Sequence, residues 1–221
     1  MRTTPAVDLL ADKLAAAVTA LDATGQRIGL TLLRLLALGD PVGAAAVAER
    51  AGLPEARIAA ALDRWPGVFR DERGDVIGYA GLTVREMGRH RIHVNGRALS
   101  TWCAYDTLFL PELLGRTAGV TSRCPATGKA ISLIVGADGV RDLQPAEAVV
   151  SFLVPDSAFG DDVIQSFCHY VHFFASEGAA ATFTSEHEQP FALSVEDSFE
   201  VGRRVNRARF GQALDELAGG V

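Results

Sequence analysis

The chain has 221 residues, of which 48% are hydrophobic and 22% are charged. This balance excludes a disordered tail, a collagen-like fibre and a coiled-coil rod, and the length allows one generous domain or two small ones. The formal charge of −6 disfavours a protein that binds nucleic acid or anionic membranes over its whole surface, because such binding needs a basic face. Residues 1–100 carry a net charge of +2 and residues 101–221 one of −8, which indicates two regions with different roles.

The N-terminus does not resemble a signal peptide, since Asp8 and Asp12 interrupt any apolar run there. No segment approaches the roughly 18 apolar residues that a membrane-spanning helix requires. We therefore expect a soluble, cytoplasmic protein with no membrane partner. The three cysteines, Cys103, Cys124 and Cys168, are an odd number and form no CxxC pair, so we expect free thiols.

The first part of the chain has the element order of a winged helix. Apolar residues at helical spacing predict four helices, at residues 7–22, 30–38, about 42–51 and about 55–64. A polar turn at 71–75 lies between two apolar runs, 68–70 and 76–79, and predicts a hairpin. We predict an α+β protein in which a winged-helix-like region, 1–82, precedes a catalytic domain, 83–221, with a mixed or antiparallel sheet and flanking helices.

A winged helix suggests DNA binding, with residues 55–64 as the recognition helix. This segment offers Arg57 and Arg64, but also Glu55 and Asp63, and it has no Asn, Gln or Lys to contact bases or phosphates. The sequence therefore favours a module that serves as a packing partner, and we expect no nucleic-acid partner. A metal-responsive winged-helix regulator stays open as an alternative function.

Residues 83–100 are rich in arginine and also contain His90 and His93. Such a cluster could bind an anion, but a solvated strand pair followed by a linker is the more common explanation. The two histidines alternate as strand neighbours do, and no further ligands lie nearby in the sequence. We therefore predict no metal site there.

The segment around Cys103 carries the strongest sign of chemistry. If it is helical, Cys103 and Asp106 lie on one face, because residues i and i+3 are neighbours on a helix. Alone this pair is a weak signal, since buried cysteines often only fill a core. A hairpin is expected at about 120–135, with Cys124 near the end of its first strand, followed by strands at 149–154 and from about Cys168 or His169, and by a helix from Asp197.

Several blocks of this sequence strongly resemble organomercurial lyase, also called alkylmercury lyase. In the order of that family, the blocks are Trp102-Cys103-Ala104-Tyr105-Asp106-Thr107-Leu108, Leu114-Gly115-Arg116-Thr117-Ala118, Ala126-Thr127-Gly128 and Phe167-Cys168-His169-Tyr170-Val171-His172-Phe173-Phe174-Ala175-Ser176. The resemblance covers roughly residues 100–176 and extends weakly to the helix near Val201. It also implies a winged-helix-like N-terminal region that is not known for DNA binding. One departure is His169, where some members have a second cysteine, and that neighbour is not essential in the family.

The resemblance implies that Cys103, Asp106 and Cys168 are catalytic and that they hold mercury as substrate and product. The chemistry agrees, because thiolates are the soft ligands that mercury prefers and a carboxyl group can deliver a proton to carbon. The family's counterpart of Cys124 is structural, and we expect a packing role for it here. We expect Trp102 to form a wall of the pocket, although core filling would explain it nearly as well.

The resemblance implies protonolysis of the carbon–mercury bond, which yields a hydrocarbon and Hg(II) in mercury detoxification. No tightly bound cofactor is implied, but external thiols must remove Hg(II), and mercuric reductase is a candidate recipient. A soft-metal carrier is a further alternative. Cys103 and Cys168 would suffice for a carrier, whereas Asp106 distinguishes the enzyme.

Overall fold

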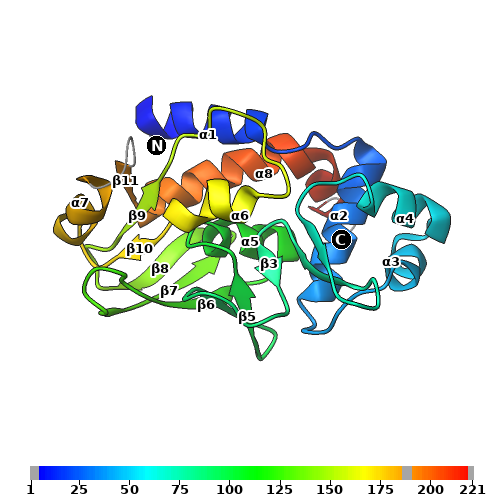
Figure 1. Ribbon diagram of the computed structural model, residues 1–221, viewed down its shortest axis with the longest axis horizontal. Coiled ribbons are helices and arrows are strands. Elements are labelled where there is room, and N and C mark those ends of the chain that lie inside the picture. Colours follow the sequence, from blue (N-terminus) through cyan, green and yellow to red (C-terminus); the bar gives the residue numbers. More distant parts are fainter. Residues whose placement is uncertain (1–4, 186–190, 219–221) are drawn as a thin grey trace.

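Strands from both halves of the chain form one antiparallel sheet (Figure 1). The computed structural model describes residues 5–185 and 191–218. The sheet has eight strands in the order β1-β2-β3-β5-β4-β6-β7-β8, and a second sheet has three in the order β10-β9-β11. All strand pairs in the described segments are antiparallel. The predicted α+β class with antiparallel sheets and flanking helices is therefore confirmed.

The strands are β1 (Val68–Arg70), β2 (Val76–Tyr79), β3 (Leu82–Thr83), β4 (Arg91–Val94), β5 (Arg97–Thr101), β6 (Ala118–Arg123), β7 (Ala130–Gly136), β8 (Gly139–Gln144), β9 (Val149–Phe152), β10 (Phe173–Phe174) and β11 (Phe191–Ser194). The helices are α1 (Pro5–Ala17), α2 (Ala23–Leu36), α3 (Ala44–Ala51), α4 (Glu55–Leu62), α5 (Asp106–Leu114), α6 (Val163–Ser166), the 3-10 helix η1 (Cys168–Tyr170), α7 (Glu177–Ser185) and α8 (Val195–Ala218). None of the helices in the described segments combines the length and the apolarity needed to cross a membrane.

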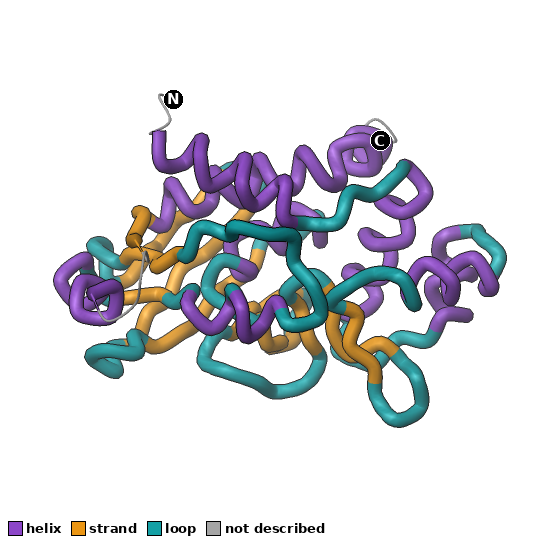
Figure 2. The backbone as a smooth tube through the Cα atoms, turned by 45° about the horizontal axis from the view of Figure 1, so that its top comes forward, coloured by secondary structure: helices purple, strands orange, loops and turns teal. Residues whose placement is uncertain are grey.

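Helix α8 is the central packing element of the fold. It contacts α1, α2, α5 and strand β8, and it lies between α1 and the sheets in Figures 1 and 2. The helix forms because apolar side chains recur on one face, and Val201, Val205 and Phe210 of that face are buried. Helix α1 packs against the first part of α8 in one hydrophobic cluster, and α2 packs against Phe210 of α8 in a second, so α8 belongs to both clusters.

The first predicted helix, 7–22, is wrong at its C-terminal end. Helix α1 ends at Ala17, and Asp22 is the N-cap of the next helix, where its carboxylate accepts a hydrogen bond of 2.7 Å from the backbone N–H of Gly25. An Asp side chain at this position favours a helix start over a helix interior. Helix α2 consequently begins at Ala23, earlier than the predicted start at residue 30.

The strand predicted from about Cys168 or His169 is wrong at its N-terminal end. Residues 168–170 form a 3-10 turn, closed by a hydrogen bond from the Val171 N–H to the Cys168 carbonyl, and strand β10 begins only at Phe173. The aromatic, β-branched composition that predicted a strand instead fills the core with Val171, Phe173 and Phe174. Burial accounts for all three residue types, and only Phe173 and Phe174 also lie in a strand.

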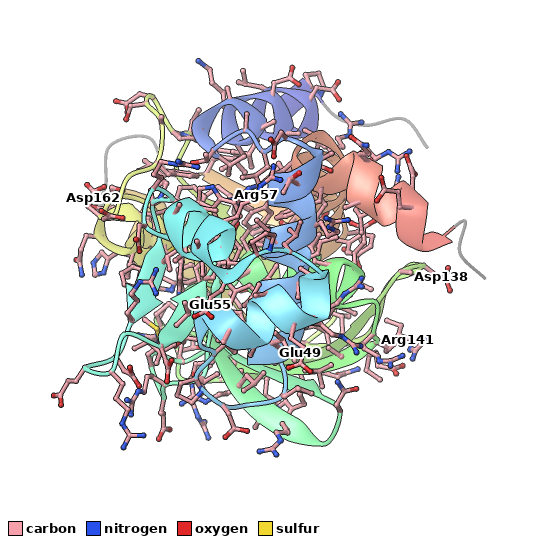
Figure 3. The ribbon with its side chains drawn as sticks, turned by 90° about the vertical axis from the view of Figure 1, so that its right-hand side faces the viewer. Glu49, Glu55, Arg57, Asp138, Arg141 and Asp162 are labelled. Carbon is pink, nitrogen blue, oxygen red and sulfur yellow. The ribbon has the colours of Figure 1, made fainter. Side chains whose placement is uncertain are left out.

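Helices α3 and α4 form the end of the molecule that faces the viewer in Figure 3. Glu49 and Glu55 lie on this end together with Arg57. The Arg57 guanidinium donates a hydrogen bond of 3.3 Å to the Thr24 hydroxyl of α2. The exposed end of α4 therefore carries both signs of charge, and its single arginine, Arg57, is hydrogen-bonded to α2.

Candidate active site

Two thiols and a carboxyl group lie together in the core. Cys103 lies in the turn between β5 and α5, Asp106 is the first residue of α5, and Cys168 begins the turn η1. Their sulfur and oxygen atoms all lie within 4.8 Å of one another, and all three residues are buried. They form the one such cluster of metal-binding side chains among the described residues. The prediction that the sulfurs of Cys103 and Cys168 lie only a few Å apart is confirmed.

Two hydrogen bonds between side chains and the backbone fix the position of Cys103. The Asp106 carboxylate accepts a hydrogen bond of 2.7 Å from the Cys103 N–H, in the manner of an acidic side chain that reaches back over a helix N-terminus. The Thr101 hydroxyl donates one of 2.9 Å to the Cys103 carbonyl. Cys103 thus precedes the helix, although the helical spacing correctly predicts that it is a neighbour of Asp106.

The turn that carries Cys168 is held against the turn that carries Cys103. The Ala104 N–H donates a hydrogen bond of 3.2 Å to the Val171 carbonyl, which links the two turns directly. The Ser151 hydroxyl, buried in β9, donates to the Tyr170 carbonyl at 2.7 Å and accepts from the His172 N–H at 3.0 Å. These bonds set the position of Cys168 relative to Cys103 although 65 positions separate them in the sequence.

Gly81, between β2 and β3, makes room for the Asp106 carboxyl. Its φ of +93° is a conformation that favours glycine, and a Cβ atom built on it would lie 2.5 Å from Cγ of Asp106. The Gly81 carbonyl also accepts a hydrogen bond of 3.0 Å from the Trp102 N–H. The first 82 residues therefore supply part of the wall around the carboxyl group.

Burial shifts the proton affinities of all three groups upward. It raises the pKa of Asp106 to about 7, although the hydrogen bond from the Cys103 N–H opposes the rise. Burial, the hydrogen bond with Cys168 and the charge of Asp106 raise the pKa of Cys103 well above its usual value. The hydrogen bond from Cys103 lowers the pKa of Cys168, but burial and the Asp106 charge outweigh it, so this pKa is raised too. Near neutral pH the two thiols therefore keep their protons. The Asp106 carboxyl group readily gains or loses a proton at that pH.

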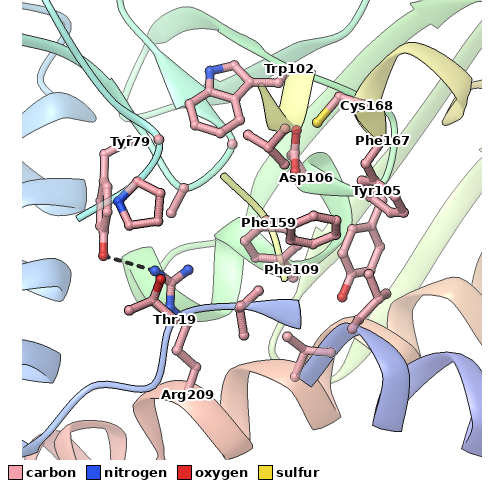
Figure 4. A pocket seen from close by; sticks show the side chains of 18 of the residues that line it. Thr19, Tyr79, Trp102, Tyr105, Asp106, Phe109, Phe159, Phe167, Cys168 and Arg209 are labelled. Atoms are coloured by element: carbon pink, nitrogen blue, oxygen red, sulfur yellow. Dashed lines mark hydrogen bonds between the residues drawn. The ribbon is translucent and has the colours of Figure 1, made fainter. Parts of the chain in front are cut away.

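A cavity leads to this cluster (Figure 4). Cys168, Asp106 and Trp102 line it, whereas the fully buried Cys103 lies behind them. Trp102 is thus a wall of the pocket, as predicted. Most of the remaining lining is apolar and comes from distant parts of the chain: Leu14, Val18, Phe109, Phe159, Val163, Phe167, Val205 and Phe210. Such a lining suits a hydrocarbon group.

The other candidates lie outside the cavity. Cys124 follows β6, is buried and has no disulfide partner. Burial opposes ionisation of Cys124, but hydrogen bonds from Thr127 and from the backbone of Ala175 lower its pKa overall. His90 is buried and contacts His172, with 3.4 Å between ring nitrogens, while His93 is exposed.

Three residues of the site were not found from the sequence. Gly81 acts through its backbone, Tyr105 lies inside the first motif, and Arg209 lies on α8, outside the four residue blocks that carry the resemblance. Tyr105 could have been suspected from its place between Cys103 and Asp106. No local signal marks Gly81 or Arg209, because only the packing of distant elements brings them to the cavity.

Comparison with known proteins gives a consistent result. A sequence profile described as alkylmercury lyase matches residues 82–207. The alkylmercury lyase of Pseudomonas putida is 45% identical over 176 residues, which cover 80% of this chain and 81% of that protein. The alkylmercury lyase of Staphylococcus epidermidis is 42% identical over 182 residues, 82% of each chain. The crystal structure of the mercury-bound form of MerB2 has the same fold, with a TM-score of 0.70 and 22% identity, over 91% of this chain and 98% of that one.

Proposed function

The chain belongs to the alkylmercury lyase family, and on that premise we propose that it cleaves the carbon–mercury bond of organomercurials by protonolysis. The products are a hydrocarbon and Hg(II), and the role is mercury detoxification. The observation that carries this proposal is the cluster of two thiols and a carboxyl group within 4.8 Å at the inner end of an apolar cavity. Two soft ligands beside a proton donor are what the reaction requires.

Cys168 makes the first bond to mercury, because it lines the cavity and Cys103 lies behind it. Asp106, with a pKa of about 7, accepts the proton of a thiol as sulfur binds mercury. Cys103 then adds the second sulfur. Two thiolates place electron density on mercury and so make the carbon atom more basic.

The bond changes balance without an added oxidant or reductant. Two sulfur–mercury bonds form. Two groups leave mercury: the organic group and the anion or thiolate that accompanied the organomercury cation. The two thiol protons follow them. One leaves with the accompanying group, and the other passes through Asp106 to carbon, which keeps the electron pair of the broken carbon–mercury bond. Hg(II) is then held by Cys103 and Cys168.

Release of Hg(II) requires external thiols, because two protein sulfurs bind it tightly. Small thiols are therefore partners of the cycle, with mercuric reductase as the candidate acceptor of the metal. Such thiols are abundant in reducing compartments, which favours a cytoplasmic location. The chemistry involves only side chains of this protein and the substrate, so no tightly bound cofactor has a role in it.

The winged-helix-like region, 1–82, has the role of a packing partner in this proposal, and residues 83–221 form the catalytic region. Two observations support this role. Strands β1, β2 and β3 belong to the same sheet as β4 and β5. The Asp106 carboxyl also occupies the position that a side chain at Gly81 would need. The mixed charges around Arg57 and Glu55 disfavour the regulator alternative.

The test is release of benzene from phenylmercury by the purified protein with excess small thiol. We expect benzene above the level of a protein-free control. A protein that binds Hg(II) with two thiolates but releases no benzene would be the soft-metal carrier and would refute the proposal.

A further inference from the structure

The cavity that holds Cys168 also has a positively charged region. Arg209 of α8 lines this cavity, and its guanidinium donates a hydrogen bond of 3.2 Å to the Tyr79 hydroxyl (Figure 4). It also lies 5.7 Å from the Tyr79 ring centroid and 5.2 Å from that of Phe210. No carboxylate within residues 5–185 and 191–218 lies within 4.0 Å of it. Arg209 is therefore a cation that aromatic rings position but that no acidic group of these segments neutralises.

Two buried polar atoms of the same cavity lack a hydrogen-bond partner. They are the Nε atom of Arg209 and the hydroxyl of Tyr105, and they are the only such side-chain atoms in the part of the chain that the structure describes. Leaving a buried donor unpaired destabilises the folded protein, because the donor has lost its hydrogen bonds to water. Both atoms can donate a hydrogen bond, and neither has an acceptor among the described residues.

The Tyr105 hydroxyl cannot easily turn toward another partner. Its ring is wedged between Phe109 and Phe152, with centroids 5.0 and 5.5 Å away, and its hydroxyl oxygen points away from Asp106 in Figure 4. A Cβ atom on Gly202 of α8 would lie 3.6 Å from this ring, so the helix also confines it. The unpaired hydroxyl is thus a fixed feature of the cavity.

We propose that the Arg209 region of the cavity binds an anionic group on the organic part of the substrate, so that the protein favours arylmercurials that carry a carboxylate. The inference rests on the proposed function, since Cys168 and Cys103 must take the mercury end. An aryl ring suits the apolar lining between the thiols and the guanidinium, which includes Phe109 and Phe159. The carboxylate then accepts charge-assisted hydrogen bonds from Arg209.

The experiment compares three mercurials in single-turnover reactions: phenylmercury, 4-carboxyphenylmercury and the methyl ester of the latter. The ester has nearly the shape of the acid without its charge. We expect wild type to cleave the acid at least tenfold more efficiently, as kcat/KM, than the ester. In Arg209→Gln this ratio should fall to about one, and in Arg209→Lys it should be intermediate because a charge remains.

The matched control is Arg207→Gln, which changes an exposed arginine of the same helix that pairs with Asp215 outside the cavity. Its acid-to-ester ratio should equal that of wild type. Circular dichroism verifies folding, and if Arg209→Gln fails to fold, the wild-type ratio decides alone.

A wild-type ratio near one would overturn the inference, as would a folded Arg209→Gln protein that keeps the full ratio. Arg209→Gln could instead slow only the multiple-turnover reaction, in which a carboxylated thiol removes Hg(II), and leave single turnover unchanged. That result would also overturn the inference, because Arg209 would then bind the carboxylate of the thiol and not that of the substrate. Failure of the proposed function looks different, because then phenylmercury itself yields no benzene.

Discussion

Replacing Asp106 with Asn should make the protein more stable and much less active. The Asp106 carboxyl is buried among Cys103, Trp102 and Gly81, and burial raises its pKa to about 7 from its ordinary value of 3.8. In the unfolded chain the carboxyl group ionises near that lower value. Between the two pKa values the folded protein holds a proton that the unfolded chain has released. This contribution to stability is fully present below pH 4 and is lost as the pH rises through 7.

The magnitude follows from the separation of the pKa values. Each pH unit within the window changes the free energy of unfolding by about 1.4 kcal/mol. From pH 5 to pH 8 wild type should therefore lose roughly 2–3 kcal/mol through this group. An asparagine side chain has no such titration and can still accept the hydrogen bond from the Cys103 N–H. The stability advantage of Asp106→Asn over wild type should grow by that amount between the two pH values.

Urea unfolding of both proteins at pH 5, 6, 7 and 8, with a reductant that keeps thiols free, measures the difference. Asp138→Asn is the control, because it makes the same chemical change on an exposed carboxyl group in the turn after β7. A difference between Asp106→Asn and wild type that does not change with pH would refute the burial argument. The variant should still bind Hg(II) through its sulfurs, yet lose about 10²–10⁴-fold in turnover of phenylmercury. Turnover near the wild-type rate would show that the proton reaches carbon by another route.

Four further substitutions probe the site and the residues that support it. Cys103→Ser and Cys168→Ser should each lose both stoichiometric Hg(II) binding and benzene release, and a single variant that keeps turnover would exclude the two-thiolate mechanism. Gly81→Ala should lower turnover at least tenfold, because its Cβ atom would displace the Asp106 carboxyl and strain a backbone with positive φ; an unchanged pH–rate profile and rate would contradict this. Cys124→Ala should cost about 1–2 kcal/mol of stability with little change in turnover, measured by thermal melting beside the benzene assay, whereas normal melting with lost turnover would make it a ligand.

The sequence predicts elements well where local signals agree. The hairpin of β1 and β2 and the end of β6 just before Cys124 follow from turn residues between apolar runs. It fails at the turn that carries Cys168, because Phe167 and Phe173 owe their residue types to burial in the core. The helix break before Asp22 was missed because the apolar pattern continues through the N-cap of α2.

The candidate site shows the same division. Cys103 and Asp106 are close in sequence, so spacing alone indicates their proximity. The approach of Cys168 depends on hydrogen bonds from Ser151 and Ala104, and no spacing rule expresses these contacts. The family resemblance identifies Cys168 as a residue of the site, whereas only the packing of the folded chain identifies Arg209.

The continuity of the large sheet limits how this chain can be divided. Strand β3 covers the edge of β5 through the pairs Leu82↔Thr101 and Thr83↔Ser100. A fragment that begins after residue 83 would expose that edge, and an uncovered strand is a template for association with other chains. It would also leave Asp106 facing solvent where Gly81 now encloses it, so the carboxyl group would ionise more readily and hold its proton less well. A chimaera that joins residues after 83 to a foreign N-terminal part must therefore supply equivalents of Gly81, Leu82 and Thr83. These residues cover the edge of β5 and keep the pKa of Asp106 raised.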